Sequence, residues 1–129
     1  MPTSQTQKPA ARSYTWSDLP EDRPMDLIAR KRILGEKMMI SRVVLEKGFT
    51  VASHRHENEQ FAVLLSGVVT FGVGEEGTDD YRVITCKGGD TLHLPSNVPH
   101  SAEAIEQSII LDLFSPPSEK TGIDTPHSV

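Results

Sequence analysis

The stretch GFTVASHRHENEQFAVLLSG, residues 48–67, contains two runs that are typical of β-strands, residues 49–56 and 60–67. Both runs are rich in valine, leucine, phenylalanine and other residues that favour strands. Glycine stands at each end of the stretch, where a strand can turn. The polar letters HRHENEQ (54–60) lie where the runs meet and hold two of the five histidines of the chain. The stretch therefore predicts two neighbouring strands with a candidate site between them.

The same alternation of short strands and turns continues on both sides of this stretch. Glycine-rich or proline-rich turns separate the runs, and almost nothing between Met38 and Phe114 has the spacing of a helix. Many short strands at regular spacing predict an all-β sandwich or closed barrel. The further runs that predict strands are residues 38–46, 68–74, 81–86, 90–95 and 108–114.

The length of 129 residues fits one domain. We expect a flexible N-terminal tail over residues 1–13, a single barrel domain over 14–117 and a C-terminal tail over 118–129. Residues 14–37 contain two prolines that interrupt any long helix. We interpret this segment as a strand or loop that packs on the edge of the barrel.

The composition disfavours several partners. A formal net charge of −5 argues against nucleic acid, which needs a basic surface. The basic run Arg30-Lys31-Arg32 is interpreted as solvated surface. No apolar run approaches the roughly 20 residues needed to span a membrane, and the N-terminus lacks the apolar stretch of a secretory signal. The single cysteine, Cys86, cannot form an internal disulfide. We expect a cytoplasmic protein.

Four polar side chains have the spacing of a metal site. On an extended strand His54 and His56 project from the same face, and Gln60 has the same parity. His100 follows the turn 95–99, which would bring the chain back toward them. Imidazole suits a divalent transition metal such as zinc, nickel, manganese, iron or copper. Two histidines on a strand are more often simply surface or half-buried residues, so the spacing alone does not establish a metal site.

A longer pattern favours the metal. The chain resembles the two signature motifs of the cupin superfamily, with the resemblance covering about residues 38–117. It implies a double-stranded β-helix (jelly-roll) barrel, metal ligation by His54, His56, Gln60 and His100, and a homodimer. Gln60 stands where glutamate is more frequent in the family, and Asn97 replaces a glycine, although asparagine tolerates positive φ. The motif residues are Gly48, His54, His56, Gln60 and Gly67, then Gly89, Pro95, Asn97 and His100.

Three segments narrow the resemblance. HENEQ (56–60), GDTLHLPSNVPHSAEAIEQ (89–107) and LDLFSPP (111–117) resemble a subgroup of single-domain cupins of pectin degradation, which convert 4,5-unsaturated uronates into linear keto sugars. The resemblance implies that Asp112 is the general acid/base and that Phe114 contacts substrate. Buried among apolar neighbours, Asp112 would have a raised pKa, as a proton shuttle requires. The alternative is an exposed aspartate on an edge strand.

One position departs from this subgroup. Relatives often carry an arginine after the final strand, where it is expected to bind the substrate carboxylate, but this chain has Ser118. Lys120, Arg42 and Arg55 are possible substitutes, although none has the matching place. Of the three we select Arg55, and we predict that it binds the substrate together with Phe114.

Two further functions stay open. The barrel can be a non-catalytic module that binds a carbohydrate or effector. It can also be an oxygenase that uses iron at the three histidines. An iron site of two histidines and one carboxylate is less favoured, because it would need Glu57 or Glu59, which point away from His56 on an extended strand. Three histidines and a neutral amide instead favour a Lewis acid that polarises a substrate oxygen. The leading prediction is therefore a metal-dependent enzyme that acts on a small sugar or sugar acid.

Overall fold

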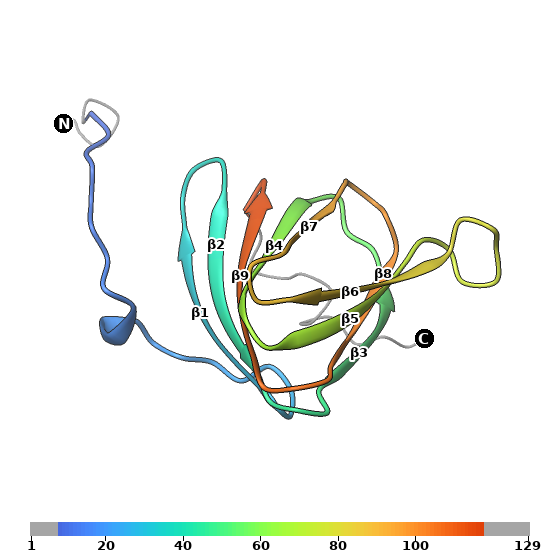
Figure 1. The fold of residues 1–129 in the computed structure, drawn as a ribbon. Coiled ribbons are helices and arrows are strands. Elements are labelled where there is room, and N and C mark those ends of the chain that lie inside the picture. Colours follow the sequence, from blue (N-terminus) through green and yellow to red (C-terminus); the bar gives the residue numbers. More distant parts are fainter. Residues whose placement is uncertain (1–7, 118–129) are drawn as a thin grey trace.

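The computed structural model describes residues 8–117, and within them nine β-strands form an all-β barrel (Figure 1). A three-residue 3-10 helix, η2 (Trp16–Asp18), precedes the first strand. The strands are β1 (Ile28–Leu34), β2 (Met39–Leu45), β3 (Thr50–His54), β4 (Glu59–Ser66), β5 (Val68–Val73), β6 (Arg82–Lys87), β7 (Thr91–Leu94), β8 (His100–Ala104) and β9 (Ser108–Ser115).

The strands lie in two antiparallel sheets. One has the order β1-β2-β9-β4-β7 and the other has the order β3-β8-β5-β6. Strands that are neighbours in space are often far apart in sequence, as with β2 and β9, which is the arrangement of a jelly roll. The all-β, double-stranded β-helix prediction is confirmed. The interpretation of residues 14–37 as an edge element is also confirmed, because β1 is the end strand of its sheet.

Alternation along the strands determines which side chains enter the barrel. In β2 the residues Met39, Ser41, Val43 and Leu45 are buried while those between them are partly exposed, and β9 alternates in the same way. Successive side chains of a strand point to opposite faces, so each sheet presents one face to the interior. Residues from both sheets form one core, which includes Leu64, Val69 and Ile110.

The turn between β4 and β5 depends on a glycine. Gly67 has φ +91° and lies against Ser108, so that an added Cβ would fall 2.1 Å from the Ser108 Oγ atom. That hydroxyl accepts a hydrogen bond from the backbone N–H of Val68 at 3.1 Å. Only a residue without a side chain satisfies both the positive φ and the close approach. The hairpin is thereby fixed against the start of β9.

Three expectations from the sequence were wrong or incomplete. The strand expected over 49–56 ends at His54, so His56 lies in the loop that follows. Strand β8 was not predicted. The basic run 30–32 is not simply solvated surface, because the Arg30 side chain is only 4% exposed; its strand belongs to the barrel wall.

The predicted division into tails and one domain stays a prediction. Residues 8–13 have no secondary structure and are exposed. The predicted C-terminal tail, with Ser118 and Lys120, lies outside the described residues, as do residues 1–7. No helix between residues 8 and 117 is long and apolar enough to cross a membrane.

Candidate metal centre

Three histidines converge at one end of the barrel. His54 ends β3 and His100 begins β8, and the two are directly opposite each other in the antiparallel ladder. His56 reaches the same point from the loop after β3. The ring centroid of His100 lies 4.4 Å from that of His54 and 5.0 Å from that of His56. Strand β3 with the loop that follows it, and the distant strand β8, thus present three imidazoles to one place.

Each of these rings is oriented by a backbone carbonyl two residues away. The Nδ1 atoms of His54, His56 and His100 lie 2.9, 3.0 and 2.9 Å from the carbonyl oxygens of Ala52, Asn58 and Val98. A carbonyl oxygen only accepts, so each Nδ1 carries the proton and donates. The lone pair of each neutral ring is therefore on Nε2, the tautomer that a metal ligand requires.

The His100 ring is held in its neutral form by its surroundings. Burial and the nearby His54 ring lower its pKa to about 4, against the opposing effect of its hydrogen bond to Val98. A metal ligand must be unprotonated. His100 meets this condition at neutral pH without any need for the metal to displace a proton.

The loop that carries His56 is tied to the second motif. The backbone N–H of Asn97 donates to the His56 carbonyl at 2.8 Å, and Asn97 has φ +65°. This agrees with the expectation that asparagine accepts the positive φ at this turn. On the other side of the loop, the Asn58 side-chain amide donates to the Pro116 carbonyl. His56 therefore has a defined position although it is not part of a strand.

Gln60 and Asp112 lie beside the histidines, on β4 and β9. Both are buried, and the Gln60 Nε2 donates to the Asp112 Oδ1 at 2.9 Å. Burial raises the pKa of Asp112 to about 7, while the Gln60 hydrogen bond and the Arg30 charge oppose that rise. The expectation of a buried Asp112 with a raised pKa agrees with the structure, and the alternative of an exposed aspartate does not.

One pocket contains all of these side chains. The three histidines, Gln60, Asp112 and Phe114 line it together with apolar core residues. The Phe114 ring meets the His56 ring edge-on, with centroids 5.8 Å apart. The pocket is thus a polar cluster over an apolar floor, the usual character of a small-molecule site.

The donor set fits a transition metal. The ligand atoms of His54, His56 and His100 lie within 4.8 Å of one another, close enough for all three to coordinate a single ion. Gln60 adds an amide oxygen from the same pocket. Three neutral nitrogens and a neutral oxygen suit zinc, nickel, manganese, iron or copper, and metal identity is not determined by the residues. Ligation by these four residues stays a prediction.

The carboxylates considered for an iron site lie elsewhere. Glu57 and Glu59 are exposed, and neither belongs to the histidine cluster. Glu59 instead pairs with His93 at 2.6 Å on the surface. A centre of two histidines and one carboxylate does not form here from these residues.

Arg55 does not enter the pocket. Its guanidinium pairs with Glu75 at 2.9 Å, and both side chains are more than half exposed. Arg55 borders a neighbouring cavity whose wall includes His54. The structure thus separates Arg55 from Phe114, the other predicted substrate contact.

Sequence reasoning missed two supporting residues. Asn58 is 5% exposed and holds the His56 loop; its place inside HRHENEQ was the available signal. Arg30 acts on the pKa of Asp112 from β1. Its signal was Ile28 two positions earlier, since residues two apart on a strand share a face.

A jelly-roll barrel with three histidines gathered at one end is a β-barrel with a candidate metal site. Residues 41–114, more than half of the chain, match the cupin domain family. The chain belongs to the cupin family. It matches no curated protein.

Solved structures with the same fold include other small cupins. The RmlC-like cupin from Shewanella frigidimarina NCIMB 400 has a TM-score of 0.75 at 20% identity, over 85% of this chain and 95% of that chain. KdgF from Halomonas sp. has a TM-score of 0.73 at 24% identity, over 85% and 97%. The chain is therefore a small cupin that resembles KdgF.

A larger protein also contains this fold. A variant of oxalate decarboxylase from Bacillus subtilis has a TM-score of 0.74 at 18% identity, over 91% of this chain but only 33% of its own length. At such identities the likeness establishes the fold.

Proposed function

We propose that this cupin converts 4,5-unsaturated uronates into linear keto sugars, with one divalent transition metal held by His54, His56, Gln60 and His100. The observation that carries the proposal is the position of Asp112, a buried carboxyl group in the same pocket as the three histidines. The motif resemblance to the pectin-degradation cupins and the fold shared with KdgF support it.

The reaction requires that a proton be added to the C4 carbon of the substrate. Ring opening breaks the hemiacetal bond between C1 and the ring oxygen, which leaves an aldehyde at C1 and an enol at C5. The enol becomes a ketone when a proton is added at C4, and the proton lost from the C1 hydroxyl balances the one gained. The pocket must therefore both accept and donate a proton.

Asp112 has the properties of that proton carrier. With a pKa of about 7, both its protonated and its ionised forms are populated near neutral pH. The hydrogen bond from Gln60 holds one carboxyl oxygen, so the group keeps a fixed orientation while the proton moves. When bound, the metal would supply Lewis-acid polarisation of a substrate oxygen.

The pocket walls complete the proposed site. Phe114 offers an apolar ring face to the sugar and lies against His56. Arg55 lines the neighbouring cavity beside His54, and its guanidinium is paired with Glu75. In this proposal it contacts a hydroxyl group of the substrate.

The test follows the double bond. Purified protein with its native metal is mixed with 4,5-unsaturated galacturonate, and the ultraviolet absorbance of the C4–C5 double bond is recorded over time. We expect the absorbance to fall faster than in buffer, and a sample stripped by a chelator to be slow until metal is restored. A metal-loaded protein that matches the buffer rate would reject the proposed function.

A further inference from the structure

Two arginines of β1 lie on the inner face of the five-stranded sheet. In the β1–β2 ladder Arg30 is opposite Val43 and Arg32 is opposite Ser41. Residues directly opposite in an antiparallel pair share a face, and Val43 and Ser41 are buried. The side chains of Arg30 and Arg32 are 4% and 23% exposed. Both side chains therefore lie on the sheet face that carries Asp112, although they line a different cavity from the histidine pocket.

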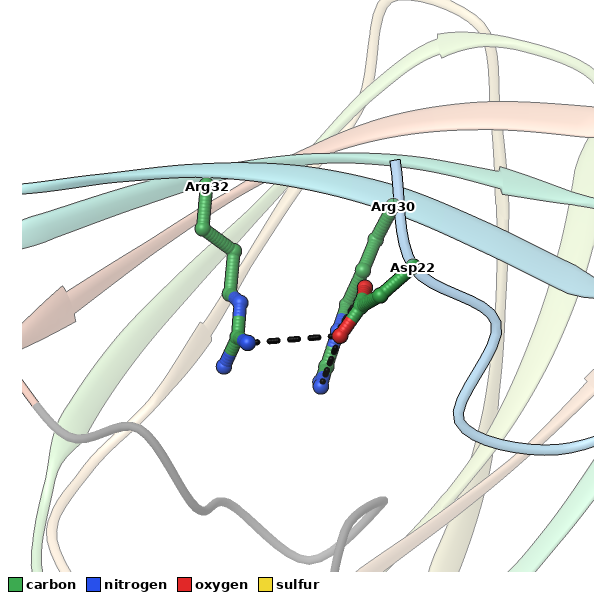
Figure 2. A network of polar contacts seen from close by, with 3 residues as sticks. All are labelled: Asp22, Arg30 and Arg32. Carbon is green, nitrogen blue, oxygen red and sulfur yellow. Dashed lines mark hydrogen bonds and ion pairs between the residues drawn. The ribbon is translucent and has the colours of Figure 1, made fainter. Parts of the chain in front are cut away.

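Asp22 holds the two guanidinium groups together (Figure 2). Arg30 donates to both of its carboxylate oxygens, from Nε at 3.0 Å and from Nη2 at 3.1 Å, and Arg32 donates from Nη2 at 3.2 Å. The backbones of Asp22 and Arg30 also exchange two hydrogen bonds of 2.9 Å. Such bidentate contacts fix orientation, so the arginine pair is preorganised.

The pair is in register with the proton carrier. Arg32 is opposite Ser41 on β2, and Ser41 is opposite Asp112 on β9. With neighbouring strands about 4.8 Å apart, the backbones of Arg32 and Asp112 are separated by about 10 Å on one face of the sheet. The charge of Arg30 already acts on Asp112. A monosaccharide beside Asp112 would therefore have one end within reach of a guanidinium group.

A cavity lies at the arginine pair. It has a volume of about 180 Å³ and is lined by Arg30, Arg32, Asp22 and Leu34 among others. Leu34 is opposite Met39, which in turn is opposite Phe114 of the histidine pocket. Glu21 also borders the cavity, but its carboxylate pairs with Arg23 at 3.0 Å. The cavity and the pocket thus lie on the same face of the sheet, with β2 between β1, which lines the cavity, and β9, which lines the pocket.

We propose that Arg30 and Arg32 form the subsite for the carboxylate of the substrate, in place of the arginine that Ser118 replaces. Arg32, the more exposed, contacts the carboxylate, and Arg30 is a positioning residue that shares the Asp22 carboxylate. The guanidinium fork matches a carboxylate bidentately. The choice of a sugar acid as ligand rests on the proposed function; the acid-binding role of the arginine pair does not.

The test compares two sugars that differ only at one carbon. Binding of D-galacturonate and of D-galactose to the metal-loaded full chain is measured by calorimetry. We expect the wild type to favour the acid by about tenfold or more, as a charge-assisted pair would, and Arg32→Gln to abolish the preference. Arg32→Lys keeps the charge without the fork and should retain only part of it.

Arg42→Gln is the matched control. Arg42 neighbours Ser41 on β2 but points to the outer face of the sheet, opposite Lys31 and Leu111. The acid preference should survive in this variant. Unfolding curves of both glutamine variants verify that each is folded before binding is measured.

The outcomes separate this inference from the proposed function. A wild type without acid preference, or an Arg32→Gln variant that keeps it, would overturn the inference even if the ring-opening assay succeeds. Loss of the preference in Arg32→Gln alone would support the inference even if no uronate is opened.

Discussion

Gln60 and Asp112 are diagonal neighbours on adjacent antiparallel strands: Gln60 is opposite Phe114, and Asp112 lies two residues before Phe114 on the same face of β9. This geometry brings the Gln60 Nε2 to 2.9 Å from the Asp112 Oδ1. Because the amide donates to Asp112 through its nitrogen, its oxygen is the atom that would bind the proposed metal. A predicted metal ligand and the predicted proton carrier are therefore linked through one side chain.

Replacing Asp112 should separate chemistry from metal binding. We expect Asp112→Asn to lower the rate of uronate opening by about 10²–10⁴-fold, because the asparagine amide neither gains nor loses a proton near neutral pH. Metal content should be unchanged, since the amide preserves the shape of the carboxyl group. The measurement is the double-bond assay with metal analysis of the same sample. Asp79→Asn, in an exposed loop, is the control, and equal rates for Asp112→Asn and wild type would remove Asp112 from the mechanism.

The histidine cluster should determine metal content. We expect His100→Ala to reduce bound metal from about one ion per chain to nearly none, because it removes one of three converging imidazoles. The measurement is elemental analysis by mass spectrometry after dialysis against excess metal. His93→Ala is the control, since His93 stacks on Phe61 and pairs with Glu59 away from the pocket. A His100→Ala protein that keeps its metal would place the ion elsewhere.

The stability of the metal-free protein should depend on pH through Asp112. Burial raises the folded-state pKa to about 7 from an ordinary value of 3.8, so between these values the folded chain binds the proton more tightly than the unfolded chain does. The stabilisation that comes from proton binding to Asp112 is complete below the pKa of the unfolded chain and is lost as the pH rises through the pKa of the folded chain. We therefore expect Asp112→Asn to be more stable than wild type at about pH 8.

Urea unfolding of chelator-treated protein tests this dependence. The advantage of Asp112→Asn should amount to a few kcal/mol at about pH 8 and should shrink as the pH approaches about 4. A difference between the two proteins that stays constant over this range would show that Asp112 does not titrate as described.

Gly67 and Gly77 both have a positive φ angle, but they should differ in their tolerance of a side chain. Gly67 has φ +91° and meets Ser108, whereas Gly77 has φ +83° with nothing within 4 Å of its added Cβ. We expect Gly67→Ala to lower the free energy of unfolding by about 3 kcal/mol or more, because strain and overpacking add. Gly77→Ala should cost about 1 kcal/mol from strain alone. Equal losses in urea unfolding would mean that β4–β5 and β9 adapt to the methyl group.

Much of the fold was predictable because it depends on local patterns. Seven of the strands follow from runs between turns, most of them rich in Val, Ile, Leu, Thr or Phe, and the buried face of β9 follows from its alternation. β8 could not be recognised in the same way. Its sequence, HSAEA, has no β-branched residue, and it is a strand because it pairs with β3 on one side and β5 on the other.

The candidate site divides along the same line. Motif spacing indicated His54, His56, Gln60 and His100 together, but the strand that was expected to align His54 with His56 ends before His56. His56 reaches the cluster because Asn97 and Asn58 hold its loop, contacts between segments that no local pattern records. The Arg30-Lys31-Arg32 run was predicted to be solvated surface from its charge alone, but the Arg30 side chain is buried.

The sequence by itself determined the alternation of strands and turns, the identity of the chemical groups and their order along the chain, because these depend on neighbouring residues. Only the tertiary structure decided which strands became neighbours. That choice placed Asp112 beside Gln60, His54 opposite His100, and Arg32 in the same row as Ser41 and Asp112. Long-range pairing has this power because a strand has two faces and two edges, and only its partners determine which of them are buried.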